Sequence, residues 1–220
     1  MSIVVRDLTG LGEWSAASAL YRSVFGYDQA EFGISPRLLA ALRENAGSVL
    51  GAFDGGELVG FCYGFSAVEA GELYHYSQAA VVAPSAQGTG VGRRLKQAQA
   101  ETARATGART MRWTFDPYAL RNAHFNFTVL GATAIRFLPD YYDDGASDRL
   151  LVSWDLAAPH VPKHECTTVT TPANDTTAAP DPTDRAALRR DLIEQFKTAH
   201  LVRVERHHNQ ATYTFERTTR

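Results

Sequence analysis

The sequence predicts a mixed α/β domain followed by a short extension made of one helix and one hairpin. Two observations support this class. Apolar runs of strand length alternate with segments of helical spacing up to about residue 156, and a stretch rich in proline and threonine follows. We therefore divide the chain into a domain over residues 1–156, a linker over 157–183 and an extension over 184–220.

The first elements are indicated by short-range signals in the chain. Ser35 and Pro36 stand where a helix N-cap and its first turn are expected. The pair Gly55-Gly56, preceded by Asp54, separates two apolar runs and predicts a hairpin. In order, we expect a strand in 2–8, a helix in 11–26, a helix in 35–47, a hairpin in 49–67 and a strand in 73–83.

The second half continues with alternating elements. A helix that begins among three glycines runs to about Thr106, with Val91, Leu95, Ala98 and Ala105 on one apolar stripe. Asp116 and Gly131 are placed to begin and end a further helix. The elements expected here are strands in 110–116, 132–138 and 149–156, a helix in 116–131, a helix in 185–200 and a hairpin in 201–217 around Asn209.

Composition excludes several classes of partner. The net charge is −2, so the protein has no strong positive electrostatic field that would attract nucleic acid or an anionic membrane. Cys62 and Cys166 are the only cysteines and do not suggest a disulfide framework. Because no apolar leader and no run of about 18 apolar residues occurs, we expect a cytoplasmic protein. The sequence leaves open whether the protein forms a homodimer.

The segment "QGTGVG", which contains Gly88, Gly90 and Gly92, lies where a strand passes into a helix. Amides at a helix start point outward and carry partial positive charge, and glycines let a bulky phosphate approach them. The alternative is a tight turn in which glycine only supplies positive φ. The Walker and dinucleotide patterns both fail, because Val91-Gly92-Arg93 follows where they require other residues.

Val82, Gln87, Gly90 and Gly92 resemble motif A of the GCN5-related N-acetyltransferase (GNAT) superfamily, in which Q/R-x-x-G-x-G/A opens a long helix. The resemblance covers residues 3–156 and implies a mostly antiparallel central sheet flanked by helices. The segments "WTFDP" and "RNAHFN" are similar to a narrower branch, which is associated with genes for N-acylamino acid racemases and o-succinylbenzoate synthases.

The resemblance implies that the protein binds acetyl-CoA or another acyl-CoA as a co-substrate. The glycine turn would hold the pyrophosphate, and the strand backbone would pair with the pantetheine arm. An amide near Val81 or Val82 would stabilise the oxyanion of the tetrahedral intermediate. The cofactor-binding residues implied are Ala80, Val81, Val82, Gln87, Gly88, Thr89, Gly90, Val91, Gly92, Arg93 and Asn126.

The catalytic side chains are less clearly indicated. Many members of the superfamily carry a tyrosine at the position of Phe127, where it protonates the leaving thiolate. Tyr118, Asn122, His124 or water are the substitutes that we consider. Candidate bases are Glu72, His75, Asp116 and His124, although Asp116 is also explained as a helix cap and His75 as a buried core histidine.

We therefore expect an acyltransferase that moves an acetyl or succinyl group from acyl-CoA to a small-molecule amine, such as an amino acid, by direct attack on the thioester. Arg112, Arg121 and Arg149 are candidates for holding a carboxylate. A non-catalytic acyl-CoA sensor or scaffold is the alternative, and the phenylalanine at position 127 favours it. We expect no metal, because "HVPKHEC" matches no common zinc spacing.

Overall fold

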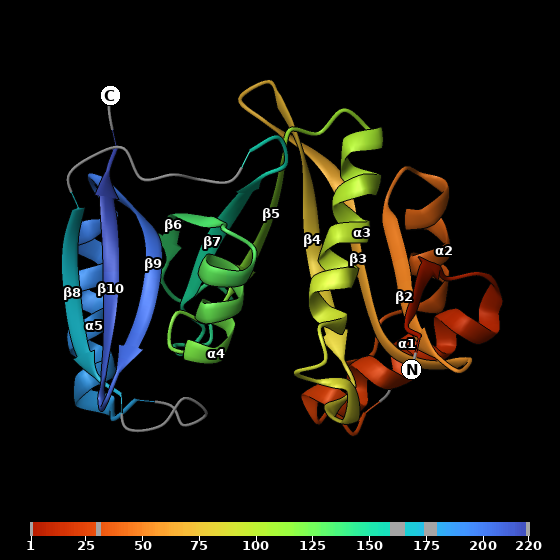
Figure 1. Ribbon diagram of the computed structural model, residues 1–220, viewed down its shortest axis with the longest axis horizontal. Helices are drawn as coiled ribbons and strands as arrows, with labels where there is room; N and C mark the ends of the chain where they lie inside the picture. The colour runs from red at the N-terminus through yellow and green to blue at the C-terminus, as the bar shows by residue number, and fades with distance from the viewer. Residues whose placement is uncertain (1, 30–31, 159–165, 174–179, 219–220) are drawn as a thin grey trace. The chain divides into compact units, whose positions relative to one another are not determined.

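The computed structural model describes residues 2–29, 32–158, 166–173 and 180–218 (Figure 1). The chain divides into two compact units, Met1–Met111 and Arg112–Arg220. Each unit combines helices with a mainly antiparallel sheet, so the predicted mixed α/β class is confirmed. Among the described residues, no helix has both the length and the apolar character needed to cross a membrane.

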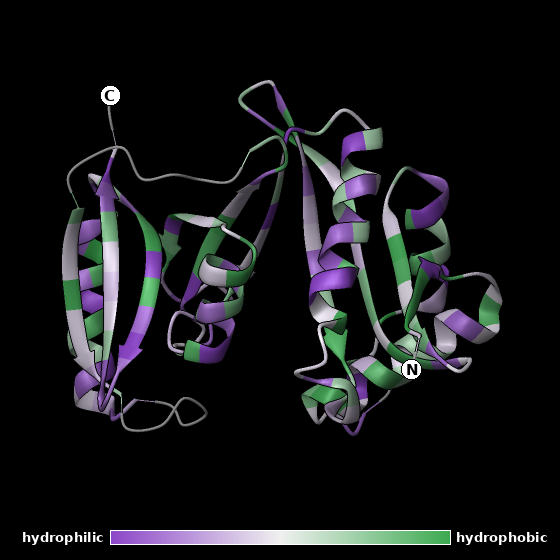
Figure 2. Ribbon diagram, in the orientation of Figure 1, coloured by the Kyte–Doolittle hydropathy of each residue, from purple (hydrophilic) through white to green (hydrophobic). Residues whose placement is uncertain are grey.

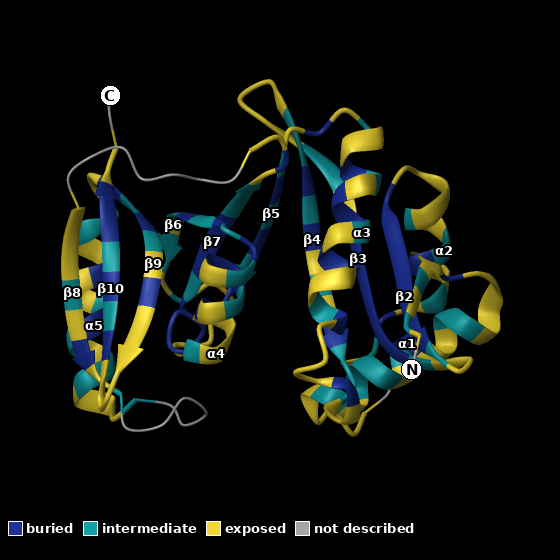
Figure 3. Cartoon of the chain, viewed as in Figure 1, coloured by how far each residue is buried: buried dark blue, intermediate teal, exposed yellow. Residues whose placement is uncertain are grey.

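The first unit is an antiparallel sheet with the order β1-β2-β3-β4 and helices packed on it. Hydrophilic residues are frequent on the visible side of α3 (Figure 2), whereas β2 is buried along nearly all of its length (Figure 3). The elements are β1 (Val4–Asp7), α1 (Gly10–Phe25), α2 (Pro36–Glu44), β2 (Ser48–Asp54), β3 (Glu57–Glu69), β4 (Glu72–Val82), the 3-10 turn η2 (Pro84–Ala86) and α3 (Val91–Ala105).

Two apolar clusters cover opposite faces of this sheet. Phe61 packs with residues of α1 and α2, while its neighbour Cys62 packs with Val91 and Leu95 of α3. Successive strand residues point to opposite faces, so the sheet is enclosed on both sides. On α3 the buried stripe differs from the predicted one, because Ala105 is exposed and polar side chains of the helix are buried.

A bulge in β4 changes which residues share a face. Tyr63 pairs with Ala79 but Gly64 pairs with Ser77, so Gln78 is an extra residue in the ladder. Strict alternation along a strand would place His75 on one face with Ala79 and Val81. The bulge interrupts that alternation, and His75 and Ser77 instead meet polar side chains from β2 and α3.

The second unit is a sheet with the order β5-β7-β6-β9-β10-β8. The extension belongs to this unit, because β9 pairs antiparallel with β6 at Ala134 and Leu201. The elements are β5 (Thr110–Phe115), α4 (Leu120–Ala123), the π-helical turn η3 (His124–Val129), β6 (Thr133–Leu138), β7 (Arg149–Asp155), β8 (Cys166–Pro172), α5 (Pro182–Gln195), β9 (Ala199–His207) and β10 (Gln210–Arg217).

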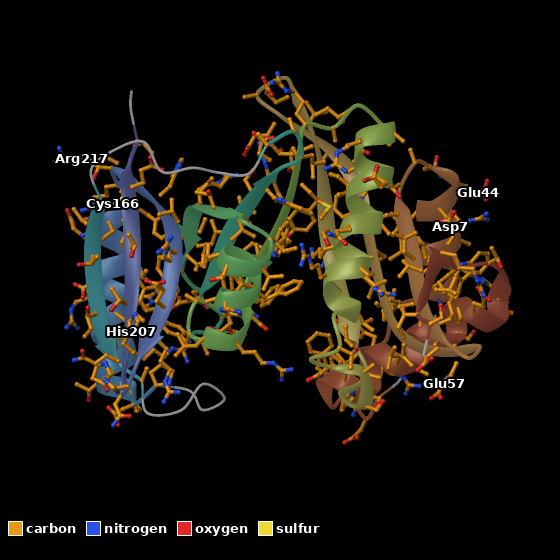
Figure 4. All side chains as sticks on the ribbon, viewed as in Figure 1. Asp7, Glu44, Glu57, Cys166, His207 and Arg217 are labelled. Atoms are coloured by element: carbon orange, nitrogen blue, oxygen red, sulfur yellow. The ribbon has the colours of Figure 1, made fainter. Side chains whose placement is uncertain are left out.

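Two elements of this unit differ from the sequence prediction. Part of the segment predicted as a linker forms β8, which pairs with β10 from Cys166 to Pro172 (Figure 4 labels Cys166). The single helix expected over 116–131 is a turn followed by α4 and η3. Asp116 caps that turn, since its Oδ1 accepts the Tyr118 amide at 2.8 Å, and the helix begins later.

Gly64 of β3 provides a test of the packing beside the bulge. A Cβ at this position would lie 2.4 Å from the Tyr76 carbonyl oxygen and 2.6 Å from His75 Nε2. We expect Gly64→Ala to lower the free energy of unfolding by about 1–3 kcal/mol, measured by urea denaturation, because backbone atoms must move.

Gly12→Ala in α1 is the matched control, since its Cβ would meet no atom within 4 Å. This control is expected to gain up to about 1 kcal/mol from helix propensity. Equal stability of Gly64→Ala and the unsubstituted protein would contradict the close approach of β3 and β4.

Candidate acyl-CoA site

The glycine turn that precedes α3 is open and adopts a conformation that favours glycine. Gly88 has a φ of 79°, and Gly90, the N-cap of α3, has a φ of 87°. A Cβ built on either residue meets nothing within 4 Å. The residues from Gln87 to Gly90 are all exposed. The turn therefore combines the left-handed backbone that glycine allows with free space around it.

The first amides of α3 point from this turn. Arg94 is the first residue whose amide bonds back to the turn, to the Gly90 carbonyl oxygen at 3.1 Å. Within the described part of the chain, no side chain caps the helix, and the Thr89 hydroxyl donates instead to the Ala86 carbonyl oxygen at 2.7 Å. The amides of Val91, Gly92 and Arg93 thus lie before the first hydrogen bond of the helix, and amides in this position suit an anion.

Two arginines follow in the first turn of α3, where the helix dipole disfavours cations. Arg94 donates to the Ile3 carbonyl oxygen at 3.2 Å, which ties the helix start to the N-terminal segment. Arg93 is exposed at the same end of the helix. A bound anion offsets the unfavourable placement of both charges, so these residues agree with the interpretation of the glycine turn.

The backbone hydrogen-bonding groups of β4 beside the turn point in defined directions. The Ala83 amide donates to the Val59 carbonyl oxygen of β3 at 2.9 Å. Backbone groups alternate in direction along an antiparallel strand, so Val81 also faces β3 while Ala80 and Val82 face away from it. In agreement, the Val82 carbonyl oxygen accepts a bond from Gln87 Nε2 at 3.1 Å.

His75 lies in a buried polar network rather than at a surface. Its Nε2 is 2.8 Å from the Ser48 hydroxyl, which also accepts a bond from Gln99 Nε2 at 2.8 Å. The ring is 0% exposed, and burial, assisted by the charge of Lys96, lowers the pKa of His75 from 6.5 to about 4. His75 is therefore neutral and weakly basic near pH 7, which favours the structural interpretation.

Lys96 of α3 is a buried lysine, and its burial is not indicated by the sequence pattern. It is 3% exposed, and its Nζ donates to the Ser77 hydroxyl at 2.7 Å. Burial lowers its pKa from 10.5 to about 7, and burial also raises the pKa of the nearby Cys62 thiol to about 12. The long aliphatic stem of a lysine can pack against apolar surface, so lysines occur at buried as well as exposed helix positions. The sequence alone therefore does not tell a buried lysine from an exposed one.

The candidates on α4 and η3 differ in exposure. Asn122 and His124 are exposed, but Asn126 is buried and its Oδ1 accepts a bond from Trp113 Nε1 at 3.1 Å. The four-residue spacing of Asn122 and Asn126 would place both on one face of a regular helix, whereas here the first is exposed and the second buried. Phe127 is buried with its ring edge-on to Phe115.

Tyr118 is buried, and its hydroxyl donates to Asp148 Oδ2 at 2.7 Å. Burial, followed by the bond to Asp148, raises the pKa of this hydroxyl well above its usual value. Both effects make Tyr118 a poor proton donor in this conformation. The sequence analysis did not identify Asp148, because Asp148 and Tyr118 are 30 positions apart in the chain and no local pattern links them.

The described residues contain no cluster of three or more His, Cys, Asp or Glu side chains that could hold a metal ion. The segment "HVPKHEC" lies outside the described residues except for Cys166. His207, labelled in Figure 4, ends β9 near the hairpin turn, as expected.

The structure therefore combines a mixed α/β fold and an antiparallel sheet with an open glycine turn at a helix start, where the amides suit an anion. The model of the acetyltransferase (GNAT) family matches residues 14–127, which is more than half of the chain. The protein belongs to the GNAT family of acetyltransferases. No match was found among curated protein sequences.

Solved structures with the same fold are similar over most of the chain. A GNAT-family protein from Desulfovibrio desulfuricans shares 18% identity with a TM-score of 0.58, covering 71% of this chain and 100% of its own. The protein yncA from Salmonella typhimurium, solved with its cofactor acetyl-CoA, shares 18% identity with a TM-score of 0.57 and coverages of 74% and 99%. The ribosomal-protein-S18-alanine N-acetyltransferase from Escherichia coli shares 17% with a TM-score of 0.56 and coverages of 72% and 97%.

The pKa of His75 leads to a test of its role. The unfolded chain binds a proton at His75 below about pH 6.5, whereas the folded chain does so only below about pH 4. Stability is therefore lost as the pH falls from 6.5 to 4, by about 3 kcal/mol at most. We expect urea denaturation to give a lower free energy of unfolding at pH 5 than at pH 7. This difference is expected to be smaller for His75→Gln, because glutamine does not titrate. An identical difference in the variant would contradict the assignment.

Proposed function

We propose that the protein transfers an acetyl or succinyl group from acyl-CoA to the amine of a small molecule such as an amino acid. The observation that carries this proposal is the open turn at Gly88 and Gly90, which presents uncapped helix amides beside the end of β4. The similarity of "WTFDP" and "RNAHFN" to the branch associated with N-acylamino acid racemase genes supports an amino acid as acceptor.

The acyl-CoA would be held by backbone groups in two segments. The amides from Gly88 to Arg93 bind the pyrophosphate, with the helix dipole adding favourable charge. The backbone of Ala80 and Val82 faces away from β3 and pairs with the pantetheine amides in the manner of an added strand. The protein thereby positions the thioester mainly with its main chain.

The direction of the β4 amides selects one donor for the oxyanion. The sequence did not decide between the amides of Val81 and Val82 as this donor, and the Val81 amide faces β3. We therefore assign the Val82 amide to the oxygen that gains charge as the acceptor nitrogen attacks the thioester carbon. The tetrahedral intermediate then expels the CoA thiolate, whose conjugate thiol has a pKa of roughly 8.5 and needs limited acid assistance.

The proton from the attacking amine passes to solvent or to an exposed side chain. His124 is the exposed candidate, because His75 is enclosed and Tyr118 already donates to Asp148. Asn122 is exposed near it in sequence and is our candidate for contacting the acceptor. Neither assignment carries the proposal, which rests on the glycine turn and β4.

A non-catalytic acyl-CoA sensor is the second candidate function. The observation that favours it is the buried Phe127, which has no proton to donate where many relatives carry a tyrosine. The hydroxyl of Tyr118, one of the substitutes considered, already donates to Asp148. Such a protein binds the same cofactor through the same turn but releases no thiol.

Thiol release separates the two functions. The protein is incubated with acetyl-CoA or succinyl-CoA and each of the standard L-amino acids, and free thiol is followed with a chromogenic disulfide reagent. The enzyme gives release that requires an acceptor, with the N-acylated amino acid found by mass spectrometry. CoA binding in calorimetry without release from any pair would support the sensor.

Gly90 allows a direct test of the turn. We expect Gly90→Val to weaken CoA binding by about 10- to 100-fold, because the side chain obstructs amides that bind a charged group. Gly71→Val is the matched control, since Gly71 also has positive φ, at 82°, with open space around it in the β3–β4 hairpin. Calorimetry measures both affinities, and equal losses in the two variants would contradict the site.

A further inference from the structure

Lys96 of α3 and Ser77 of β4 close a ring in the chain of the first unit. The Lys96 Nζ donates to the Ser77 hydroxyl at 2.7 Å, and the two residues are 19 positions apart. Between them lie the end of β4, the glycine turn and the start of α3 (Figure 1). The main-chain groups assigned above to acyl-CoA, from Ala80 to Arg93, all belong to this 77–96 ring.

The bond between Lys96 and Ser77 stands at the base of the ring, next to the bulge in β4. Ser77 directly precedes Gln78, the extra residue of the bulge. One turn further along α3, Gln99 Nε2 donates to the Ser48 hydroxyl, which also contacts His75 of β4. These two polar contacts of α3 therefore reach the sheet on one side of the bulge, and the groups assigned to acyl-CoA lie on the other.

Apolar packing within the ring constrains its geometry less sharply. Val91 and Leu95 of α3 pack in one cluster with Cys62 of β3, and Val82 packs against that cluster. Burial of apolar surface is non-directional, so it holds the helix on the sheet without setting how far the helix turns or slides. A hydrogen bond requires a short distance and an aligned donor, so the bond from Lys96 sets the position of α3 relative to β4.

The stability of the fold does not account for a lysine at this position. Lys96 is 3% exposed and Ser77 is 2% exposed. Burial of an ammonium group is unfavourable, and the unbranched apolar side chain of methionine would fill a similar space without that cost. A residue that departs in this way from the usual composition of a core is expected where function requires it.

We propose that Lys96 is a positioning residue for acyl-CoA, which acts through Ser77. It fixes the separation between the glycine turn, which takes the pyrophosphate, and the β4 backbone, which takes the pantetheine arm. The inference rests on the proposed function, because it requires one molecule to span both segments. Such a molecule binds tightly only when both segments engage it at once. Lys96 therefore affects a ligand that spans the ring more than a ligand that occupies only the turn.

Hydrogen exchange tests the anchoring without any ligand. In the full chain, we expect Lys96→Met to speed amide exchange by about tenfold or more at Ala83 and Arg94, whose amides form backbone hydrogen bonds on either side of the turn. Lys197→Met is the matched control, because it removes the same charge from an exposed side chain in the second unit. Unchanged exchange at Ala83 and Arg94 in Lys96→Met overturns the anchoring.

Calorimetry tests the consequence for binding with two probes, CoA and inorganic pyrophosphate, the second measured by its competition with CoA. We expect Lys96→Met to weaken CoA binding about five- to twentyfold and pyrophosphate binding less than twofold, because pyrophosphate occupies only the turn. Ser77→Ala removes the other partner of the bond and is expected to show the same contrast. Equal losses for the two probes overturn the positioning role, since they indicate a missing charge or a damaged turn.

Thermal unfolding separates positioning from support of the fold. We expect the double variant with Lys96→Met and Ser77→Ala to have a Tm equal to or above that of the unsubstituted protein, because both polar partners are replaced by apolar groups. Its affinity for CoA is expected to fall as in Lys96→Met. A lower Tm together with weaker CoA binding in the double variant would show a purely structural role.

The failure of each proposal has its own signature. If the unsubstituted protein binds no CoA, the proposed function fails and the cofactor part of this inference fails with it, whereas hydrogen exchange still decides the anchoring. If CoA binds but no acceptor releases thiol, the enzymatic function fails and the CoA affinities alone decide the role of Lys96. If CoA binds equally well to Lys96→Met and to the unsubstituted protein, the positioning role is wrong and the function stands.

Discussion

The conformation of the backbone at Gly88 and Gly90 is the constraint on which the site depends. Both residues lie in the left-handed region, where an L side chain is strained, and both have open space where a Cβ would stand. This geometry leads the chain from β4 into α3, and among the described residues no side chain caps the first helix amides. The positive φ values meet the requirements of the turn, and the open space around both glycines leaves room for an anion.

The sheet supports this turn through polar groups as well as through apolar packing. The bulge at Gln78 lets Ser77 and His75 meet α3 and β2, while Val81 keeps its apolar contacts on the other face. Burial of Lys96 and His75 is unfavourable unless their hydrogen bonds are made, so the network fixes one register for β4. That register determines that the Val82 amide faces away from β3.

The sequence predicted those features that local rules control. The glycine turn, the Asp54-Gly55-Gly56 hairpin and the Ser35-Pro36 helix start are each encoded by adjacent residues. The bulge at Gln78 escaped prediction, because one inserted residue leaves the apolar pattern nearly intact. Strand β8 escaped for a different reason: its threonine-rich sequence is stabilised by pairing with β10, about 40 residues further along the chain.

The extension is a part of the second unit's core, and this follows from aromatic contacts rather than from its polar surface. Phe196, at the end of α5, packs against Phe137 of β6 and Phe215 of β10, with centroids 6.3 and 5.7 Å away. The buried Tyr213 donates to the Pro117 carbonyl oxygen at 3.0 Å. Because β6, the turn at Pro117 and the extension share one interior, the extension cannot be displaced without exposing that interior to water. The extension is therefore a packed part of the second unit rather than a detachable tail.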